Sequence, residues 1–190
     1  MDRTIDILDR RNVDNHISEL AIVHPDVIMG KGNIIMEGAI IRKGVQMGDN
    51  NYVGPYCIIG DPAEKHGFFD RLGNVLIGSN NRFTKQVTID SSTEGVTIVK
   101  DDVIMLKNAH VGHDARIESS VILSCNVCIG GHTVVGAFTN FGLGAVAHQR
   151  VIILHHCMVG MNSTITKKTP VREARKLVGS PARDIGPNIR

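Results

Sequence analysis

A parallel β-helix is the all-β fold that this sequence predicts, and three observations predict it. Apolar residues recur at every sixth position through most of the chain. Glycine follows the apolar residue in ten of these hexads, and a small or β-branched residue stands four places after it in most of them. A period of six matches neither the roughly 3.6 residues of an α-helical turn nor the alternation of a β-hairpin. It does match one strand and one corner of a β-helix.

The apolar positions form three blocks, which begin at Val23, Ile77 and Val99. Three hexads make a triangular coil of eighteen residues, so residues eighteen apart are expected to lie one above the other, about 4.8 Å apart. The following glycine is expected to relieve the corner, where the backbone needs a positive φ. The apolar positions are Val23, Met29, Ile35, Ile41, Met47, Val53, Ile59, Ile77, Phe83, Ile89, Val99, Met105, Val111, Ile117, Leu123, Ile129, Val135, Phe141, Ala147, Ile153, Val159 and Ile165.

The extent of the repeat predicts a single domain with a cap at each end. Residues 23–166 carry the β-helix, residues 1–22 are charged and lack the repeat, and residues 167–190 form a basic tail. Caps are expected because an open β-helix end is an unpaired strand edge. Two polar segments, 61–74 and 91–96, interrupt the repeat and are expected to project as loops, which often carry function.

Composition narrows the functional class. The net charge of +2 is too small to indicate a nucleic acid or a membrane surface as the partner. The four cysteines are scattered, which indicates reduced thiols rather than disulfides. Because the sequence contains neither a signal peptide nor an apolar run long enough to span a membrane, a cytoplasmic location is expected.

The coil period groups several polar residues in the second half of the chain. His113, Gly131 and Gln149 are eighteen residues apart and should form one column, with Asp114, His132 and Arg150 in the column beside it. Histidine exchanges a proton near neutral pH, and a neighbouring carboxylate can fix its tautomer. His113 and Asp114 can act as such a pair only at a coil corner, because adjacent residues on a straight strand point to opposite faces.

Three segments carry a resemblance to a known family. Residues 108–114 (Asn-Ala-His-Val-Gly-His-Asp), 130–132 (Gly-Gly-His) and 145–149 (Ala-Val-Ala-His-Gln) resemble, in sequence and spacing, the UDP-N-acetylglucosamine O-acyltransferases of lipid A synthesis. These are hexapeptide-repeat acyltransferases, and the resemblance covers roughly residues 23–166. It implies a left-handed β-helix, an exception to the right-handed crossover rule.

The resemblance also implies roles for individual residues. His113 corresponds to the general base, Asp114 to the carboxylate that orients it, and the Gly131 N–H to the group that stabilises the oxyanion. Residues 179–183 (Gly-Ser-Pro-Ala-Arg) resemble a stretch near the end of many coenzyme A-dependent members. The residues implied at the acceptor are Asn108, His110, His132, His148 and Gln149, and those implied at the donor are Gly142, Gly144 and Arg183.

The function implied by this resemblance is acyl transfer from a thioester, carried by acyl carrier protein or coenzyme A, to a hydroxyl or amine of a nucleotide-linked sugar. No bound cofactor or metal is implied. The family resemblance further implies a homotrimer with its sites between neighbouring subunits. Partners are therefore expected to be the nucleotide sugar, the thioester donor and two further copies of the chain.

Three departures from the family pattern bear on the substrate. The chain ends at Arg190, short of the C-terminal helical domain expected for the family. Asp90-Ser91 replaces a basic histidine-arginine pair, and Leu143 replaces a glycine near the acyl chain. Because of these three departures, the resemblance does not identify the acceptor sugar or the length of the acyl chain.

Two other functional classes share the repeat. A γ-carbonic anhydrase-like zinc enzyme would bind its metal through three histidines across a subunit interface, for which His148, His155 and His156 are the candidates. A non-catalytic β-helix scaffold would be expected to lack the base, whereas His113 and Asp114 are both present.

Overall fold

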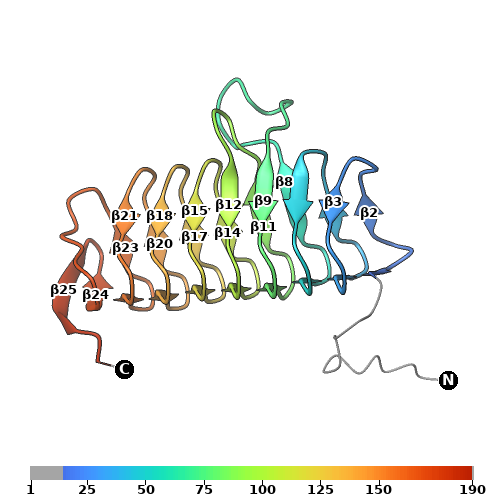
Figure 1. The fold of residues 1–190 in the computed structure, drawn as a ribbon. Coiled ribbons are helices and arrows are strands. Elements are labelled where there is room, and N and C mark those ends of the chain that lie inside the picture. Colours follow the sequence, from blue (N-terminus) through green and yellow to red (C-terminus); the bar gives the residue numbers. More distant parts are fainter. Residues whose placement is uncertain (1–14, 190) are drawn as a thin grey trace.

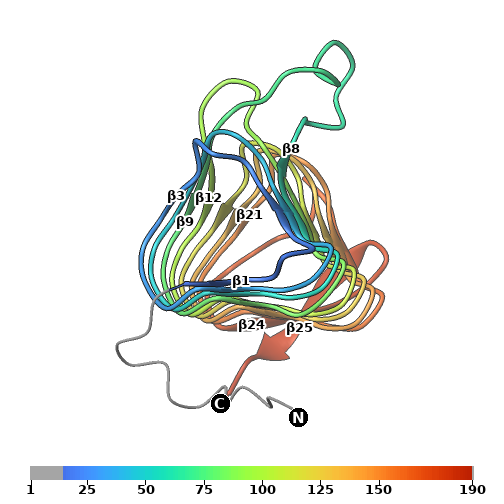
Figure 2. The same ribbon diagram turned by 90° about the vertical axis from the view of Figure 1, so that its right-hand side faces the viewer.

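The computed structural model describes residues 15–189, and these form a three-sided parallel β-helix (Figure 1). Viewed along its axis, the rod has a triangular cross-section with one sheet on each side (Figure 2). Pairing between successive coils is parallel throughout the described residues, except for the last pair of strands. The all-β, parallel β-helix prediction is therefore confirmed.

The three sheets, here named A, B and C in the order in which the chain visits them, contain ten, eight and seven strands. Sheet A comprises β1 (His16–Ile17), β4 (Ile34–Ile35), β7 (Tyr52–Val53), β10 (Arg82–Phe83), β13 (Ile104–Met105), β16 (Ile122–Leu123), β19 (Asn140–Phe141), β22 (Met158–Val159), β24 (Arg175–Gly179) and β25 (Ala182–Pro187). Sheet B comprises β2 (Ile22–Val23), β5 (Ile40–Ile41), β8 (Ile58–Asp61), β11 (Thr88–Asp90), β14 (His110–Val111), β17 (Cys128–Ile129), β20 (Val146–Ala147) and β23 (Thr164–Ile165). Sheet C comprises β3 (Ile28–Met29), β6 (Val45–Met47), β9 (Val75–Ile77), β12 (Thr97–Val99), β15 (Arg116–Ile117), β18 (Val134–Val135) and β21 (Ile152–Ile153).

The apolar residue of each hexad forms the core of the rod. All of the predicted positions are buried except Val23 and Met29, which lie in the first coils and are partly exposed. Burial of this continuous apolar column is the main favourable term holding the coils together. The six-residue count therefore predicted the core correctly.

The β-helix extends beyond the predicted limits at both ends. Ile17 in β1 pairs with Ile35, so the first hexad begins within the predicted cap of residues 1–22. The rest of that cap, residues 1–14, lies outside the described residues. At the other end Leu177 in β24 pairs with Val159 and is fully buried. Both residues continue the six-residue spacing of the repeat. The predicted boundaries of 23–166 therefore ended the β-helix too early on both sides.

The C-terminal segment forms a β-hairpin that caps the rod. β25 pairs antiparallel with β24 at the end of sheet A. Arg175 on β24 and Asp184 on β25 form an ion pair with an Nε to Oδ2 distance of 2.7 Å. The hairpin protects the last strand edge of the rod, as a terminal cap must.

The glycines that follow the apolar residues have a different role from the one predicted. Only Gly60 among the ten has a positive φ, of 83°. Positive φ occurs instead two residues after this position, mostly at residues other than glycine, such as Asp114 (58°) and His132 (56°). A Cβ on Gly130 would lie 2.6 Å from the Gln149 backbone nitrogen, and one on Gly54 would lie 1.6 Å from the Thr84 carbonyl oxygen. These glycines therefore allow close stacking of successive coils.

A ladder of buried asparagines stabilises the corner between sheets A and C in the first half of the rod. Asn33, Asn51 and Asn81 occupy the position that is small or β-branched in most other hexads. The Asn51 side chain donates to Asn33 Oδ1 at 3.0 Å and to the Gly78 carbonyl at 2.9 Å, and its own oxygen accepts from the Asn81 N–H at 3.0 Å. Hydrogen bonding between side chain and backbone thus replaces apolar packing there.

No helix within residues 15–189 has the length and apolar character needed to cross a membrane.

Replacing Asn51 with alanine is expected to destabilise the protein, because the buried Asn81 N–H would lose its hydrogen-bond partner. Each buried group left unpaired costs roughly 1–3 kcal/mol. Denaturant titration should show this loss in Asn51→Ala and little change in Asn140→Ala, where the half-buried side chain lies on the outer face of β19. Equal stability of Asn51→Ala and the unmodified protein would contradict the role of the ladder.

Candidate active site

The corner between sheets B and C, here called the B–C edge, gathers both loops and the histidine cluster. Residues 62–74 connect β8 to β9, and residues 91–96 connect β11 to β12, so both loops leave the rod at this edge. They project side by side in Figures 1 and 2. Lys65 links them through Thr93 Oγ1 at 3.3 Å and Glu94 Oε1 at 3.6 Å. The next coils bring His113, Gly131 and Gln149 to the same edge.

His113 and Asp114 form a hydrogen-bonded pair at this edge. Asp114 has a φ of 58°, a left-handed conformation that turns the chain and places both side chains on the same side. His113 Nδ1 lies 2.9 Å from Asp114 Oδ2, and the two side chains are only 12% and 7% exposed. The geometric condition for a histidine-carboxylate pair is therefore met.

Asp114 is also held by the shorter loop. Its Oδ2 accepts hydrogen bonds from the Thr93 N–H at 2.9 Å and the Thr93 hydroxyl at 2.8 Å, and its Oδ1 accepts one from the Gly95 N–H at 2.9 Å. Burial opposes ionisation of this carboxyl, but the hydrogen bonds from His113, Thr93 and Gly95 outweigh it and hold the pKa of Asp114 well below its usual range. Asp114 is thus a fixed anion beside His113.

Gly131 lies directly against the His113 imidazole, one coil further along the rod. A Cβ added to Gly131 would lie 2.7 Å from His113 Nε2, so any larger residue would displace the ring. The buried Gly131 N–H makes no hydrogen bond within residues 15–189. At several other corners a side chain of the next coil caps the equivalent N–H, for example Asp49 on Lys31 and Asp101 on Ser79. An unpaired donor therefore remains beside the candidate base.

His132 packs edge-on against the same imidazole. The two ring centroids are 5.0 Å apart with an interplanar angle of 87°. His132 Nε2 is buried without a hydrogen-bond partner in the described part of the chain, 3.8 Å from Asp114 Oδ2. Burial and the positive charge of Arg150 lower the pKa of His132, with Asp114 acting in the opposite direction. His132 Nε2 is thus a buried, unpaired polar atom beside the candidate base.

His110 lies on the outer face of β14, the strand of sheet B that immediately precedes His113 at the B–C edge. Its Nδ1 is 2.8 Å from Thr88 Oγ1, and its Nε2 is 3.8 Å from Asp90 Oδ2. Burial lowers the pKa of His110 and raises that of Asp90 to about 7. The Glu64 N–H stabilises the Asp90 carboxylate, while the charges of Glu64 and Asp61 favour its protonated form.

The remaining predicted acceptor residues lie around this cluster rather than in its centre. His148 and Gln149 are exposed one coil beyond Gly131, and His148 Nδ1 is 3.0 Å from the Gln149 carbonyl oxygen. Asn108 lies at the opposite end of β14, at the corner between sheets A and B, where it donates to Asn126 at 3.2 Å. The geometry therefore groups Asn108 with the donor-side residues more closely than with His113.

The predicted donor residues do not form one cluster with the base. Gly142 and Gly144 flank the corner between sheets A and B, and the Gly144 N–H donates to the Cys125 carbonyl at 3.0 Å. Arg183 is exposed on β25 in the terminal cap. Gly142 and Gly144 therefore lie at one corner of the rod, Arg183 lies in the terminal cap, and His113 lies at the B–C edge.

Sequence reasoning missed the contributions of Thr93 and Glu64, and treated Asp90 only as a departure from the family pattern. The repeat did contain information about where the loops lie. Both loops connect a strand of sheet B to the next strand of sheet C, and His113 lies in a connection of the same kind. Identifying which loop residue touches Asp114 required the conformation of the loops.

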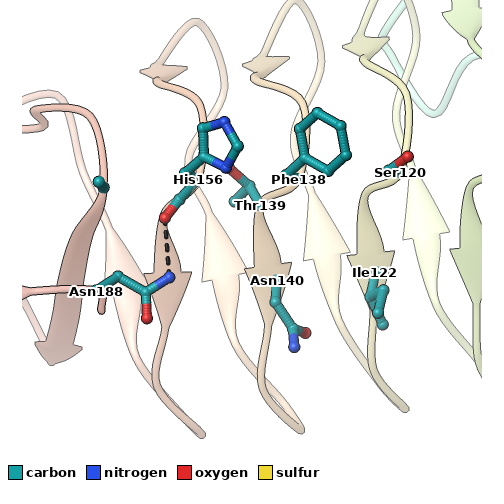
Figure 3. Close-up of a pocket in the computed structure, with 8 residues that line it drawn as sticks. Ser120, Ile122, Phe138, Thr139, Asn140, His156 and Asn188 are labelled. Atoms are coloured by element: carbon teal, nitrogen blue, oxygen red, sulfur yellow. Dashed lines mark hydrogen bonds between the residues drawn. The ribbon is translucent and has the colours of Figure 1, made fainter. Parts of the chain in front are cut away.

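The histidines considered for zinc are not brought together. His148 lies at the B–C edge, whereas His155 and His156 lie at the corner between sheets C and A. His156 stacks on Phe138 at a centroid distance of 4.9 Å, beside a surface cavity of about 460 Å³, and its carbonyl accepts from Asn188 (Figure 3). Within the described residues, the grouping compatible with a metal is His113, Asp114 and His132. His148, His155 and His156 are therefore not grouped within a single subunit.

Comparison with known proteins agrees with the repeat. Residues 26–61 match the family model described as bacterial transferase hexapeptide (six repeats). The chain is 30% identical over 158 residues to acyl-[acyl-carrier-protein]–UDP-N-acetylglucosamine O-acyltransferase from Campylobacter concisus, covering 81% of this chain and 60% of that protein. The enzyme of the same name from Burkholderia orbicola is 32% identical over 127 residues, covering 65% and 48%. The chain thus spans about half to three-fifths of the length of these relatives.

Solved structures show the same architecture. The UDP-N-acetylglucosamine acyltransferase of Bacteroides fragilis matches with a TM-score of 0.82 and 24% identity, over 90% of this chain and 74% of that one. The Campylobacter jejuni enzyme gives 0.77 and 22%, over 90% and 75%. The fold is accordingly a left-handed parallel β-helix. Residues 26–61 thus carry the bacterial transferase hexapeptide repeat, and the chain is similar in sequence to the UDP-N-acetylglucosamine O-acyltransferases.

Proposed function

We propose that this protein is an acyltransferase that moves an acyl group from a thioester to a nucleotide-linked sugar, with His113 as the general base. One observation carries the proposal: the His113–Asp114 pair faces Gly131, whose buried N–H has no partner within residues 15–189. A base and an oxyanion donor on adjacent coils are the two groups that acyl transfer to a nucleophile requires. The names of the relatives support the same class of reaction.

The hydrogen bond to Asp114 suits the proton transfer. With Nδ1–H donated to Asp114 Oδ2, the lone pair on Nε2 is free to accept a proton from the acceptor. The deprotonated oxygen or nitrogen attacks the thioester carbon, and negative charge develops on the carbonyl oxygen. The Gly131 N–H is placed to stabilise this charge. Collapse of the intermediate breaks the C–S bond, and the thiolate leaves with the proton from His113.

The same proposal includes substrates and location. The acceptor contacts His110, His132, His148 and Gln149, and the donor runs past Gly142 and Gly144 toward Asn108 and Arg183. The donor is acyl carrier protein, as in the names of the relatives, or coenzyme A. Because these are soluble carriers, we expect the protein to act in the cytoplasm without a bound cofactor.

A homotrimer is also part of this proposal. The outward column of sheet C, here called the stripe, includes the exposed apolar residues Ile28, Leu76 and Ile152, with Gln46 and Arg116 between them in register. Exposed apolar side chains of this kind favour burial against another subunit. A neighbour packed there would face His113 and the two loops.

Light scattering of the purified protein at micromolar concentration should therefore give three times the 20.6 kDa mass of one chain. Ile152→Lys would place a charge on the stripe and is expected to shift the mass toward that of the monomer. A monomeric unmodified protein would contradict the trimer.

Replacement of His113 by alanine is expected to lower kcat by about 10² to 10⁴, because the acceptor loses its proton acceptor. Thermal unfolding should stay close to that of the unmodified protein. The assay supplies nucleotide sugars with acyl carrier protein and coenzyme A thioesters, and mass spectrometry identifies the product. His24→Ala is a matched control, because His24 is exposed in the N-terminal coils.

Retention of normal turnover by His113→Ala with a confirmed substrate would contradict this assignment. The base would then have to be sought at His110 or His132.

A further inference from the structure

Two carboxylates near His110 have no lysine or arginine partner within residues 15–189. The Asp90 side chain is 8% exposed, and its nearest basic group is His110 Nε2 at 3.8 Å. Glu64 lies close enough for its charge to influence Asp90, His110 and Cys128. Within residues 15–189 neither carboxylate pairs with lysine or arginine, whereas Asp61 pairs with Arg42 at 2.8 Å. Negative charge is therefore left uncompensated on this part of the site.

The location of these carboxylates connects them to the reaction. Asp90 ends β11, directly after Ile89, which pairs with Val111 in the coil that carries His110 and His113. His110 and His113 are close enough to interact electrostatically. A ligand that contacts His110 Nε2 therefore lies close to the Asp90 carboxyl group.

A buried carboxylate without a cation is costly, and the site gains most from a ligand that supplies a positive charge or a hydrogen-bond donor. A hydroxyl supplies only one donor, and a phosphate would be repelled by Asp90 and Glu64. An ammonium group supplies a full charge and three donors.

We infer that the acyl acceptor carries an amino group, which Asp90 and Glu64 bind as the ammonium ion, so that the product is an amide. This inference rests on the proposed acyl transfer and specifies its substrate class, an amino sugar linked to a nucleotide. Asp90 is the specificity-determining residue. His113 remains the base for the attacking atom.

The proton balance of this reaction is complete. The bound ammonium gives one proton to Asp90, whose pKa near 7 suits it to accept and release a proton. The neutral amine attacks the thioester carbon, forming the C–N bond, and His113 removes the second proton. The C–S bond breaks, His113 protonates the thiolate, and Asp90 releases its proton to solvent.

The test compares two acceptors that differ at one atom, a UDP-linked sugar with an amino group at the acylated carbon and its hydroxyl counterpart. Each is assayed with acyl carrier protein and coenzyme A thioesters. The unmodified protein is expected to favour the amine by about 10² or more in kcat/KM, as the loss of a buried charge partner predicts. Asp90→Asn should lose most of this preference, mainly through the amine, while the hydroxyl rate stays within about threefold.

A matched control is Asp102→Asn, because Asp102 is exposed at the corner between sheets C and A and has a φ of 59° that asparagine also tolerates. It should keep the full preference for the amine. Equal or greater kcat/KM for the hydroxyl acceptor in the unmodified protein would overturn the inference while leaving acyl transfer intact. If neither acceptor is acylated, the proposed function fails and this inference fails with it.

A second experiment measures how unfolding depends on pH. It tests whether Asp90→Asn folds and whether Asp90 is buried as described. The folded-state pKa of Asp90, about 7, lies above its ordinary value of 3.8, owing to burial and to the charges of Glu64 and Asp61. Its contribution to stability is therefore present below about pH 4 and is lost as the pH rises through about 7. Asparagine resembles the protonated acid, so the denaturation midpoint of Asp90→Asn should fall less over this range. His110, which faces Asp90, remains in both proteins. An identical pH profile would contradict the charge environment on which the inference depends.

Discussion

The parallel register between successive coils is the constraint on which the rest of the structure depends. It buries one apolar residue per hexad, and it fixes which corner residue stacks on which. His113 meets Gly131 because the His132 N–H donates to the His113 carbonyl at 2.9 Å, one step of that register. The glycines at 112 and 130 have no Cβ to hold the next coil away. A slip of one residue between these coils would remove both the core and the site.

Much of the fold could be predicted from the sequence, because an uninterrupted six-residue period has one structural explanation. The same phase, followed further, would have included Ile17 and Leu177 in the rod. The role of the glycines was wrong, because spacing identifies a corner but not which of its residues has a positive φ. The asparagine ladder was missed. The pattern considered only apolar and small residues, whereas these asparagines form hydrogen bonds with the equivalent asparagine of the next coil.

The site was predictable where it follows from the coil period and unpredictable where it follows from the loops. His113, Gly131, Gln149 and His132 are grouped as predicted, whereas Asn108 lies at another corner of the rod. Thr93 and Gly95 fix Asp114 from a segment outside the repeat. The uncompensated charge on Asp90 depends on the longer loop, which brings Glu64 but no basic group to it. We therefore infer that specificity depends on Asp90 at the end of β11 together with Glu64 of the longer loop, whereas the shorter loop holds Asp114 of the proton-transfer pair in the repeat.

The central claim is that Asp114 holds His113 with its proton on Nδ1, which leaves Nε2 open toward the acceptor. Nitrogen NMR of the labelled imidazole measures this directly, at a pH where the ring is neutral. Our account predicts a protonated Nδ1 and an unprotonated Nε2 in the unmodified protein, with the preference lost in Asp114→Asn. A proton found on Nε2 of His113 in the unmodified protein would contradict it.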